Sequence, residues 1–354
     1  MRVVILGPMP PPYGGVSTHV RRLRERIRVH SPCEVWSRAH EAGPADHCFG
    51  NFEEGLRALL ELPEETIYHA HAYHLLAGRL AKEGRRVVVT IHNPRLHRVL
   101  AGTGSLRSWF GMWPTRRAFR AVRHFIAVSD GARDSIVTAG LRGRSIRVIN
   151  AFLPPGPDET ADPENLRQLA DFRRRHRQVV TANAWRLDFF AGEDLYGVDL
   201  CLALIERFAR EGRSVGLVLA LPLAEGSDYL RQLQEQADAL QVSDRVLWLT
   251  RPGAYHPIIR ECDLFLRPTN TDGFSISIAE AFEVGVPVVA SDAVPRPRGC
   301  VLFRSRDQDE FYGAVRRSLD DLPALRSAVP GWREPDHFDE IHAVYREIAA
   351  GQSR

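Results

Sequence analysis

The chain has 354 residues, a length that predicts two domains rather than one. Its hydrophobic content of 44% and charged content of 26% are ordinary for a globular protein, and a net charge of +3 does not indicate a nucleic-acid-binding protein. No apolar run reaches the length of a membrane span, the N-terminal run is too short for a signal peptide, and the five cysteines form no C-x-x-C pair. We therefore expect a cytoplasmic protein without disulfides.

The first half of the chain alternates short apolar runs with amphipathic segments, a pattern that predicts parallel strands joined by helices. This pattern makes residues 1–155 a first Rossmann-like domain. The expected strands are Val3–Leu6, Thr66–His69, Val87–Ile91, Phe125–Val128 and Ile146–Ile149, and the expected helices are Val16–Val29, Phe52–Leu62, Leu75–Glu83 and Gly131–Ala139.

The segment Leu153–Pro163 is rich in proline and acidic residues and marks a linker, which we place at 156–175. A second series then predicts another Rossmann-like domain at 176–335, facing the first across a cleft, and a C-terminal helix at 336–354 that crosses back to the first domain. The expected strands are Val179–Ala182, Val215–Leu221, Val246–Leu249, Leu264–Arg267, Val286–Ala290 and Gly299–Phe303, and the expected helices are Val198–Arg210, Asp228–Ala239, Ala254–Arg260 and Phe274–Val284.

Ligands of such sheets bind beyond the carboxyl ends of strands, and the segment Thr269–Ala281 lies in that position. Within it, seven residues separate the carboxylates of Asp272 and Glu280. The pattern predicts a loop that enters a helix near Ser275, with Glu280 in the second turn and a helix end near Gly285. The start of such a helix binds anions through its unpaired N–H groups. This arrangement suits a phosphate-bearing ligand whose hydroxyls are held by carboxylates, as in a nucleotide-sugar.

Glycines and histidines follow the expected strands of the first half. Gly14 and Gly15 lie directly before a helix, where the backbone can approach a phosphate closely, although such a pair also makes plain tight turns. The segment His69–His71 ends one strand, and His92 follows the next. Alternate residues of a strand face the same way, so a metal pair is conceivable, but no further ligand has suitable spacing. Polar lining of the cleft is the favoured interpretation.

Arginine is the cation available for binding a phosphate in this chain, because Lys82 is the single lysine. Arg186 follows one strand of the second half and Arg251 follows another, so either one can grip a diphosphate bidentately. In so arginine-rich a chain, each of them can equally be a surface arginine.

The segment Ser105–Trp113 contains the aromatic residues Trp109, Phe110 and Trp113 and precedes a basic run. Aromatic side chains beside an arginine-rich helix can dock on an anionic membrane face, and an ordinary helix with a solvated basic face is an equal alternative. The basic run contains Arg116, Arg117, Arg120 and Arg123.

Taken together, these motifs resemble the GT-B fold retaining glycosyltransferases of family 4, which carry an E-x7-E signature. The form of the motif at Arg267–Asp292 resembles that of bacterial enzymes from surface-polysaccharide clusters. The matching pieces are Pro10–Ser17, His69–His71, Thr90–His92, Ala127–Ser129, Val148–Asn150 and, most specifically, Arg267–Asp292.

The resemblance implies a role for each candidate residue. Asp272 would hydrogen-bond the hydroxyls of the donor sugar, Glu280 would bind the ribose, and Arg186 would neutralise the leaving diphosphate. His92 would line the reacting centre and contact the donor sugar. The residues that would cradle phosphate through their backbone are Gly14, Gly15, Gly273, Phe274 and Ser275.

The sequence departs from the family pattern at two positions. Asp272 stands where glutamate is usual, and Tyr196 stands where a lysine is expected after the phosphate-binding arginine. The second departure leaves the diphosphate short of one positive charge. Arg251 is the arginine that we expect to replace it.

The implied reaction is the transfer of a sugar with retention of configuration from a nucleotide-sugar, expected to be UDP-linked, which is a co-substrate and not a cofactor. No metal or cofactor is expected, because arginines and a helix end can stabilise the leaving diphosphate. The expected acceptor is a saccharide or lipid-linked saccharide at the cytoplasmic face of the membrane. A nucleotide-sugar epimerase and a non-catalytic nucleotide-sugar-binding subunit are the alternatives.

Overall fold

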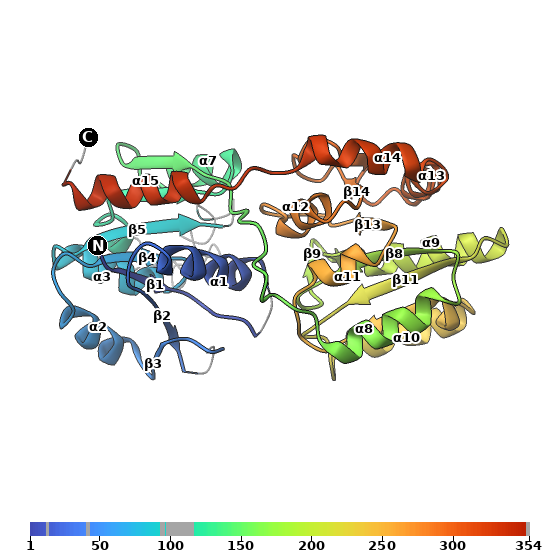
Figure 1. Ribbon diagram of the computed structural model, residues 1–354, viewed down its shortest axis with the longest axis horizontal. Coiled ribbons are helices and arrows are strands. Elements are labelled where there is room, and N and C mark those ends of the chain that lie inside the picture. The colour runs from blue at the N-terminus through green and yellow to red at the C-terminus, as the bar shows by residue number, and fades with distance from the viewer. Residues whose placement is uncertain (12–13, 40–42, 93–95, 97–116, 352–354) are drawn as a thin grey trace. The chain divides into compact units, whose positions relative to one another are not determined.

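The computed structural model describes residues 1–11, 14–39, 43–92, 96 and 117–351 (Figure 1). They form two compact domains. The first contains Met1–Leu153 together with Pro335–Arg354, and the second contains Pro154–Glu334.

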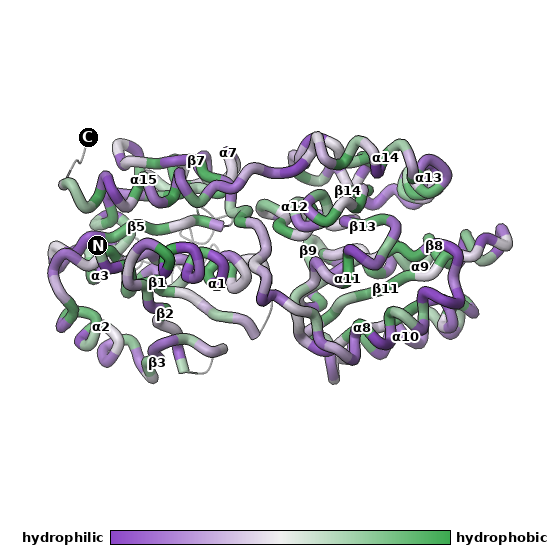
Figure 2. Tube along the Cα trace, in the orientation of Figure 1, coloured by the Kyte–Doolittle hydropathy of each residue, from purple (hydrophilic) through white to green (hydrophobic). Residues whose placement is uncertain are grey.

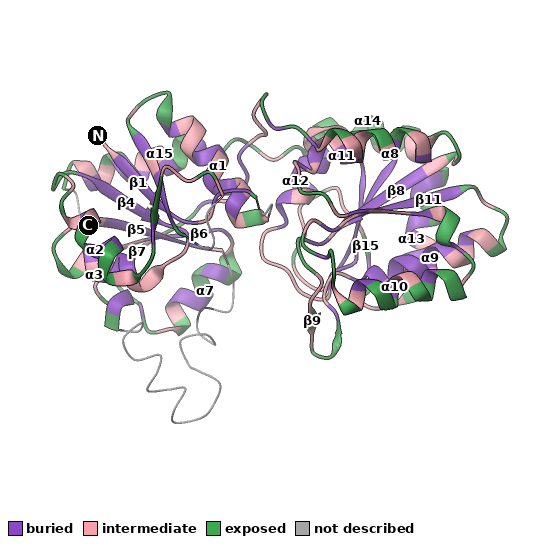
Figure 3. Cartoon of the chain, turned by 90° about the horizontal axis from the view of Figure 1, so that it is seen from below, coloured by how far each residue is buried: buried purple, intermediate pink, exposed green. Residues whose placement is uncertain are grey.

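The first domain is built on a seven-stranded parallel sheet in the order β3-β2-β1-β4-β5-β6-β7. Its central strands are mostly apolar and buried on both faces, as a sheet covered by helices on two sides requires (Figures 2 and 3). The strands are β1 (Val3–Leu6), β2 (Cys33–Arg38), β3 (His47–Phe49), β4 (Ile67–Ala70), β5 (Arg86–Ile91), β6 (His124–Ala127) and β7 (Ser145–Val148).

Helices cover both faces of this sheet. One apolar cluster joins β1 to α1 (Gly15–Arg28) and to the C-terminal helix α15 (Phe338–Ala349). Another cluster joins the opposite face to three further helices of the described part. These are α2 (Phe52–Leu60), α3 (His74–Lys82) and α7 (Asp130–Thr138).

The second domain is built on a six-stranded parallel sheet in the order β12-β11-β8-β13-β14-β15, beside a two-stranded hairpin. The sheet contains β8 (Gln178–Asn183), β11 (Val215–Ala220), β12 (Val246–Leu249), β13 (Leu264–Arg267), β14 (Val288–Ser291) and β15 (Val301–Phe303), and the hairpin contains β9 (Phe189–Phe190) and β10 (Glu193–Asp194). Apolar clusters join one face to α9 (Val198–Arg210), α10 (Asp228–Ala239) and α13 (Gln308–Asp320), and the other face to α8 (Pro163–Arg173), α11 (His256–Arg260) and α12 (Ile276–Glu283); α14 (Leu322–Ala328) follows α13.

The predicted fold class is confirmed, because the chain contains two Rossmann-like parallel sheets. The stretch expected to be a linker, 156–175, contains helix α8. Pro163 stands in the first turn of α8, Asp162 caps that turn by accepting from Glu164 N and Asn165 N, and the buried side chain of Phe172 packs into the second domain. Residues Pro335–Arg354 cluster with the first domain.

Candidate active site

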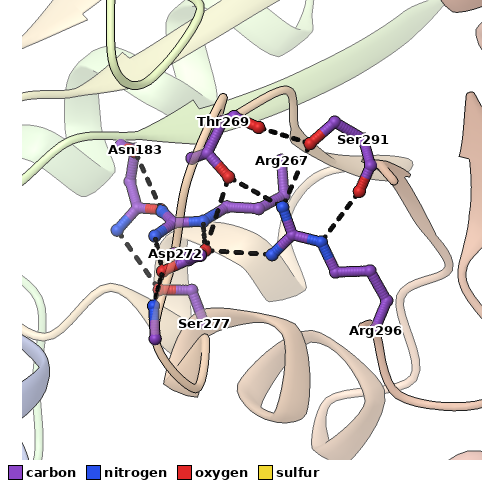
Figure 4. A network of polar contacts seen from close by, with 8 residues as sticks. Asn183, Arg267, Thr269, Asp272, Ser277, Ser291 and Arg296 are labelled. Atoms are coloured by element: carbon purple, nitrogen blue, oxygen red, sulfur yellow. Dashed lines mark hydrogen bonds and ion pairs between the residues drawn. The ribbon is translucent and has the colours of Figure 1, made fainter. Parts of the chain in front are cut away.

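Charged side chains gather at the carboxyl edge of the second domain's sheet, where β13 ends at Arg267 and the neighbouring strand β8 ends at Asn183. Arg267 is 8% exposed. It donates through Nε and Nη2 to the two carboxylate oxygens of Asp272, at 2.9 and 3.2 Å (Figure 4). Its Nη1 group donates to the carbonyl and side-chain oxygens of Asn183, at 3.4 and 3.2 Å. The arginine is thus held at the point where the two strands end.

A second arginine, Arg296, reaches the same carboxylate from the loop after β14. Its Nη1 donates to Asp272 Oδ2 at 3.0 Å, its Nη2 to Thr269 Oγ1 at 2.7 Å, and its Nε to the Ser291 carbonyl at 2.9 Å. The side chains of Arg267, Asp272 and Arg296 are 10, 11 and 2% exposed. Two buried guanidinium groups share one carboxylate, so this group of side chains has an excess of one positive charge. Because an uncompensated buried charge is costly, the arrangement favours an anion at this place.

The acceptor sites of Asp272 are filled by the protein itself. Oδ2 accepts from both arginines, and Oδ1 accepts from Arg267 and from Gly273 N at 3.0 Å. Burial alone would raise the pKa of Asp272, but the charges and hydrogen bonds of Arg267 and Arg296 outweigh that effect, and the pKa is lowered. Asp272 is therefore ionised, and in this arrangement it holds the two arginines in position.

Helix α12 follows this loop and begins at Ile276, with Ser275 at the N-cap, as the sequence predicts. The Ser275 side chain does not cap the helix. Ile278 N donates to the Ser275 carbonyl at 3.1 Å, so the N–H groups of Ile276 and Ser277 are the ones at this end without a partner inside the helix. Ser275 is 5% exposed, and its Oγ has no hydrogen-bond partner in the described part of the chain. A buried hydroxyl without a partner beside unpaired backbone donors is the kind of site that a ligand oxygen completes. Glu280 lies in the second turn of α12 and is 5% exposed.

The start of helix α9 shows the opposite arrangement. Asp194 accepts hydrogen bonds from the backbone of Tyr196, Gly197 and Val198 at 2.9 to 3.1 Å, so a carboxylate of the chain satisfies this helix end. Gly197 has a φ of 68°, and a Cβ at this position would come within 2.5 Å of the Pro268 carbonyl. The loop that carries Tyr196 therefore packs closely against the residue that follows Arg267.

Tyr196 lies near both Arg267 and Arg186, one of the two arginines that the sequence analysis proposed for the diphosphate. The guanidinium of Arg267 lies over the Tyr196 ring, 5.3 Å from its centroid. Burial raises the pKa of Tyr196, while the nearby charges of Arg267 and Arg186 lower it. Arg186 itself is exposed, pairs with Asp188 at 2.8 Å and stacks on the Trp185 ring at 4.9 Å. The structure thus brings Arg186 close to the Arg267 group.

Arg251 does not join this group. It follows β12, an edge strand that β11 separates from β8, and its side chain is exposed. Its carbonyl accepts from Asn165 Nδ2 at 2.9 Å. Of the two arginines proposed from the sequence, Arg186 lies near Tyr196 and the Arg267 group, whereas Arg251 follows β12, which β11 and β8 separate from β13.

The first domain gathers histidines at the carboxyl edge of its sheet, where His71 follows β4 and His92 follows β5. His71 Nδ1 lies 2.9 Å from His92 Nε2, so one of these nitrogens donates to the other. His69 makes its contacts inside the protein, with Nδ1 at 2.6 Å from Tyr345 Oη and Nε2 at 2.6 Å from Thr90 Oγ1. His69 is thus used by the core, and His92, which is half-buried, is the histidine best placed to meet a ligand.

These histidines are neutral at physiological pH. His19, from α1, lies beside them, its ring centroid 5.0 Å from that of His71. Burial lowers the pKa of His19 to about 4, because its effect is larger than the opposing effect of the hydrogen bond to the Ala151 carbonyl. Burial first, and then the neighbouring histidines, lower the pKa values of His71 and His92 well below the usual range. Neutral imidazoles can exchange hydrogen bonds with sugar hydroxyls without bringing charge to the site.

The glycine pair lies where the sequence predicts, at the start of α1. Gly14 is the N-cap, and Ser17 Oγ accepts from Gly14 N at 2.9 Å and donates to Gly14 O at 3.1 Å. Gly15 is exposed at the first helical position. In the described part of the chain, no cluster of three or more histidine, cysteine or acidic side chains could hold a metal ion.

Sequence reasoning assigned no role to Arg267, Arg296 or Tyr345. Arg267 had a signal, because it is the last residue of an expected buried strand, where an arginine needs a partner. Arg296 had no signal, because it lies 24 positions from Asp272 in a proline-rich turn. The partnership of Tyr345 with His69 spans 276 positions and depends on where the C-terminal helix packs.

Both domains match family models. Residues 13–156 match "Glycosyltransferase Family 4", and residues 193–321 match "Glycosyl transferases group 1". The α-maltose-1-phosphate synthase of Mycolicibacterium smegmatis is 24% identical over 98% of this chain and 94% of its own length. The D-inositol 3-phosphate glycosyltransferase of Stackebrandtia nassauensis is 29% identical over 30% of this chain and 26% of its own length.

Solved structures share the fold over the whole chain. Anabaena HepE in complex with UDP-glucose superposes with a TM-score of 0.73 at 16% identity, covering 99% of this chain and 100% of that one. Sucrose-phosphate synthase of Thermosynechococcus elongatus superposes with a TM-score of 0.68 at 14% identity, covering the same shares of the two chains.

Proposed function

Because the chain is a glycosyltransferase with the GT-B fold, we propose that it takes a sugar from a nucleotide-diphosphate-sugar, expected to be UDP-linked, and transfers it with retention of configuration. The observation that carries the proposal is the buried excess of positive charge of Arg267, Asp272 and Arg296, next to the open start of α12. The diphosphate of the donor supplies the anion that this place favours.

In this mechanism the protein acts on the leaving group. Arg267 offers its positive charge to the diphosphate together with the one N–H that Asp272 and Asn183 leave free, and Arg186 adds a second cation from the neighbouring loop. The backbone from Gly273 to Ser275 and the Ser275 hydroxyl bind the phosphate at the helix start. As the bond from the sugar to the diphosphate breaks, negative charge develops on the departing phosphate, and these donors stabilise it. The departing phosphate then takes the proton of the acceptor hydroxyl.

The other candidate residues position the sugar and the nucleotide. Glu280 binds the ribose hydroxyls of the nucleotide from the second turn of α12. In the first domain, His92 offers a neutral ring nitrogen to the donor sugar, and the backbone at Gly14 and Gly15 approaches its phosphate. Asp272 acts through the arginines that it holds. The family resemblance also implies a direct contact between Asp272 and the donor sugar, and this contact stays a prediction. Arginines and a helix end carry the phosphate charge, so the transfer is proposed to need no metal.

The acceptor is proposed to be a saccharide or a lipid-linked saccharide of surface-polysaccharide synthesis, bound by the first domain at the cytoplasmic face of the membrane. Trp109, Phe110, Trp113 and Arg116, on which the expected membrane contact rests, lie outside the described residues. In the basic run that continues from them, Arg117, Arg120 and Arg123 are exposed. The helices of the described part are each too short or too polar to cross a bilayer.

A panel of nucleotide-sugars tests the proposal. The donor should raise the melting temperature of the protein and show a dissociation constant in calorimetry, and a saccharide acceptor should then release the free nucleotide diphosphate. Interconversion of the nucleotide-sugar without an acceptor would instead identify an epimerase. Donor binding without transfer or hydrolysis would identify a non-catalytic binding subunit, and no binding of any nucleotide-sugar would contradict the proposal as a whole.

A further inference from the structure

A hollow of about 540 Å³ lies in the first domain, at the edge of the sheet opposite to the histidines. The walls of this hollow, which we call the arginine hollow, come from the turns before β5, β6 and β7 and from the end of α15. Five arginines line it, namely Arg85, Arg86, Arg120, Arg123 and Arg144.

Topology brings these arginines together. The strands β5, β6 and β7 are neighbours and run parallel, so the residues at their amino ends meet at one edge of the sheet. Arg86 begins β5, Arg123 precedes β6 and Arg144 precedes β7. His71 and His92 follow strands at the opposite, carboxyl edge. The arginine hollow is therefore separate from the sugar-transfer residues of this domain.

The arginine hollow is unusual for its charge. No aspartate or glutamate lines it, and none of its five arginines makes an ion pair within the described residues. Elsewhere in this domain arginines are commonly paired, as Arg24 is with Asp46 at 2.5 Å and Arg147 with Glu347 at 2.7 Å. Burial lowers the pKa of His124, which lines the hollow; Glu347 opposes this effect, and Arg123 lowers the pKa further. The five arginines of the hollow thus have no carboxylate partner among the described residues, and the nearby Glu347 pairs with Arg147 instead.

Two of the arginines are fixed in place by neutral acceptors. Arg85 donates to the carbonyls of Leu60 and Leu62 at 2.5 and 3.1 Å, and Arg144 donates to the carbonyl of Arg120 at 2.6 Å. These bonds orient the guanidinium groups and do not reduce their charge. Holding several like charges around one space costs free energy unless an anion compensates them.

We propose that the arginine hollow binds a phosphate group, as the recognition element of a soluble phosphate ester or of an anionic lipid headgroup. Arginine presents planar pairs of N–H donors that match phosphate oxygens, and several arginines here face one space from different turns. The volume of about 540 Å³ accommodates a small ligand. The inference goes beyond sugar transfer, since it assigns a second anion site at the amino edge of the first domain's sheet, away from the residues proposed to act on the donor.

Chemical modification of arginines by phenylglyoxal tests this site in the wild-type protein. At constant ionic strength, inorganic phosphate should slow the modification of Arg86, Arg120 and Arg123, measured peptide by peptide in a mass spectrometer. The exposed arginines Arg57 and Arg346 should react at unchanged rates. Protection of Arg86 is decisive, because it lies outside the basic run that is proposed to meet the membrane. Two outcomes would overturn the proposal. In the first, phosphate and vesicles protect every arginine equally; in the second, neither phosphate nor vesicles protect any arginine.

Vesicles separate the two sources of phosphate. If the ligand is a lipid headgroup, vesicles of phosphatidylglycerol and phosphatidylcholine should protect the same arginines and sediment with the protein, whereas pure phosphatidylcholine should do neither. If the ligand is a soluble ester, inorganic phosphate should protect and the vesicles should not.

A triple variant and a matched control complete the test. Substituting Arg86, Arg120 and Arg123 by glutamine should weaken whichever binding the wild type shows by about tenfold or more, because it removes charge-assisted hydrogen bonds. Substituting the exposed arginines Arg57, Arg177 and Arg346 by glutamine removes the same net charge outside the hollow and should leave binding unchanged. Equal losses in the two variants would mean that net charge alone attracts the ligand, and the site would be refuted. Melting temperatures like that of the wild type verify that both variants are folded.

Discussion

The charge balance around Asp272 leads to a prediction about Arg267. In the variant Arg267→Gln, one guanidinium and one carboxylate remain, so the excess positive charge disappears. Arg296 still donates to Asp272 at 3.0 Å, and Asp272 therefore keeps a charged partner. We expect the domain to fold and the affinity for UDP to fall.

The size of the loss follows from the contacts. A hydrogen bond to a charged group contributes about 1.5–3 kcal/mol, which corresponds to roughly a ten- to hundredfold change in the dissociation constant. Calorimetry with UDP measures this change directly, and a thermal melt verifies folding. Arg251→Gln is the matched control, because the exposed Arg251 follows β12, which two strands separate from β13, and its substitution should have no effect.

A second substitution tests whether Arg267 supplies the charge of the absent lysine. The Arg267 guanidinium lies 5.3 Å from the centre of the Tyr196 ring. In the double variant Arg267→Gln/Tyr196→Lys, the new ammonium should restore the excess charge and regain at least part of the UDP affinity. Wild-type affinity in Arg267→Gln alone would refute the assignment of Arg267 to the diphosphate. A double variant as weak as Arg267→Gln would refute the idea that the two positions exchange one charge.

Three further predictions concern the donor and the histidines. Glu280→Gln should weaken donor binding by roughly tenfold or more while the fold survives, and unchanged affinity in calorimetry would remove Glu280 from the site. Turnover should persist in excess EDTA, and a loss that Mg²⁺ or Mn²⁺ reverses would contradict the metal-independent mechanism. Because burial lowers the pKa of His19 to about 4, the unfolded chain binds its proton first as the pH falls. The free energy of unfolding should therefore decrease from pH 6.5 toward pH 4, and this residue contributes at most about 1.4 kcal/mol per pH unit. Denaturant titrations of the wild type and of a His19→Gln variant measure this contribution. The same pH dependence in both proteins would exclude His19 as its source.

The parts of the fold that the sequence predicted are those with a strong local signal. Central strands such as β1 and β11 are continuous apolar runs. Helix α12 starts after Ser275, at the beginning of a largely apolar segment. The strands β2 and β3 were not predicted. β2 mixes apolar with polar and charged residues, and β3 has only three residues at the edge of the sheet. Their pairing is decided by neighbouring strands and not by their own composition.

The candidate site divides in the same way. The loop, the helix start and the place of Glu280 in the second turn follow from spacing within one segment, and the structure confirms this local geometry. The burial of Glu280 was not predicted. Which arginine is buried could not be predicted, because the chain has 47 basic residues with a single lysine, so arginine content carries little information about any one position. The shared carboxylate of Arg267 and Arg296 is a tertiary property, which requires the turn after β14 to reach the end of β13.

The two departures from the family pattern have a common explanation in this arrangement. Tyr196 removes a cation from the loop before α9, and Arg267 places one beside that same ring from the end of β13. A buried arginine at a strand end needs a carboxylate partner. The short side chain of Asp272 accepts from Arg267 Nε and Nη2 at 2.9 and 3.2 Å. A carboxylate used in this way is less available to a sugar than one that faces an open pocket. We therefore infer that the aspartate in place of the usual glutamate and the tyrosine in place of the usual lysine are two parts of one exchange, in which Asp272 keeps Arg267 in place and Arg267, on the proposed function, carries the phosphate charge.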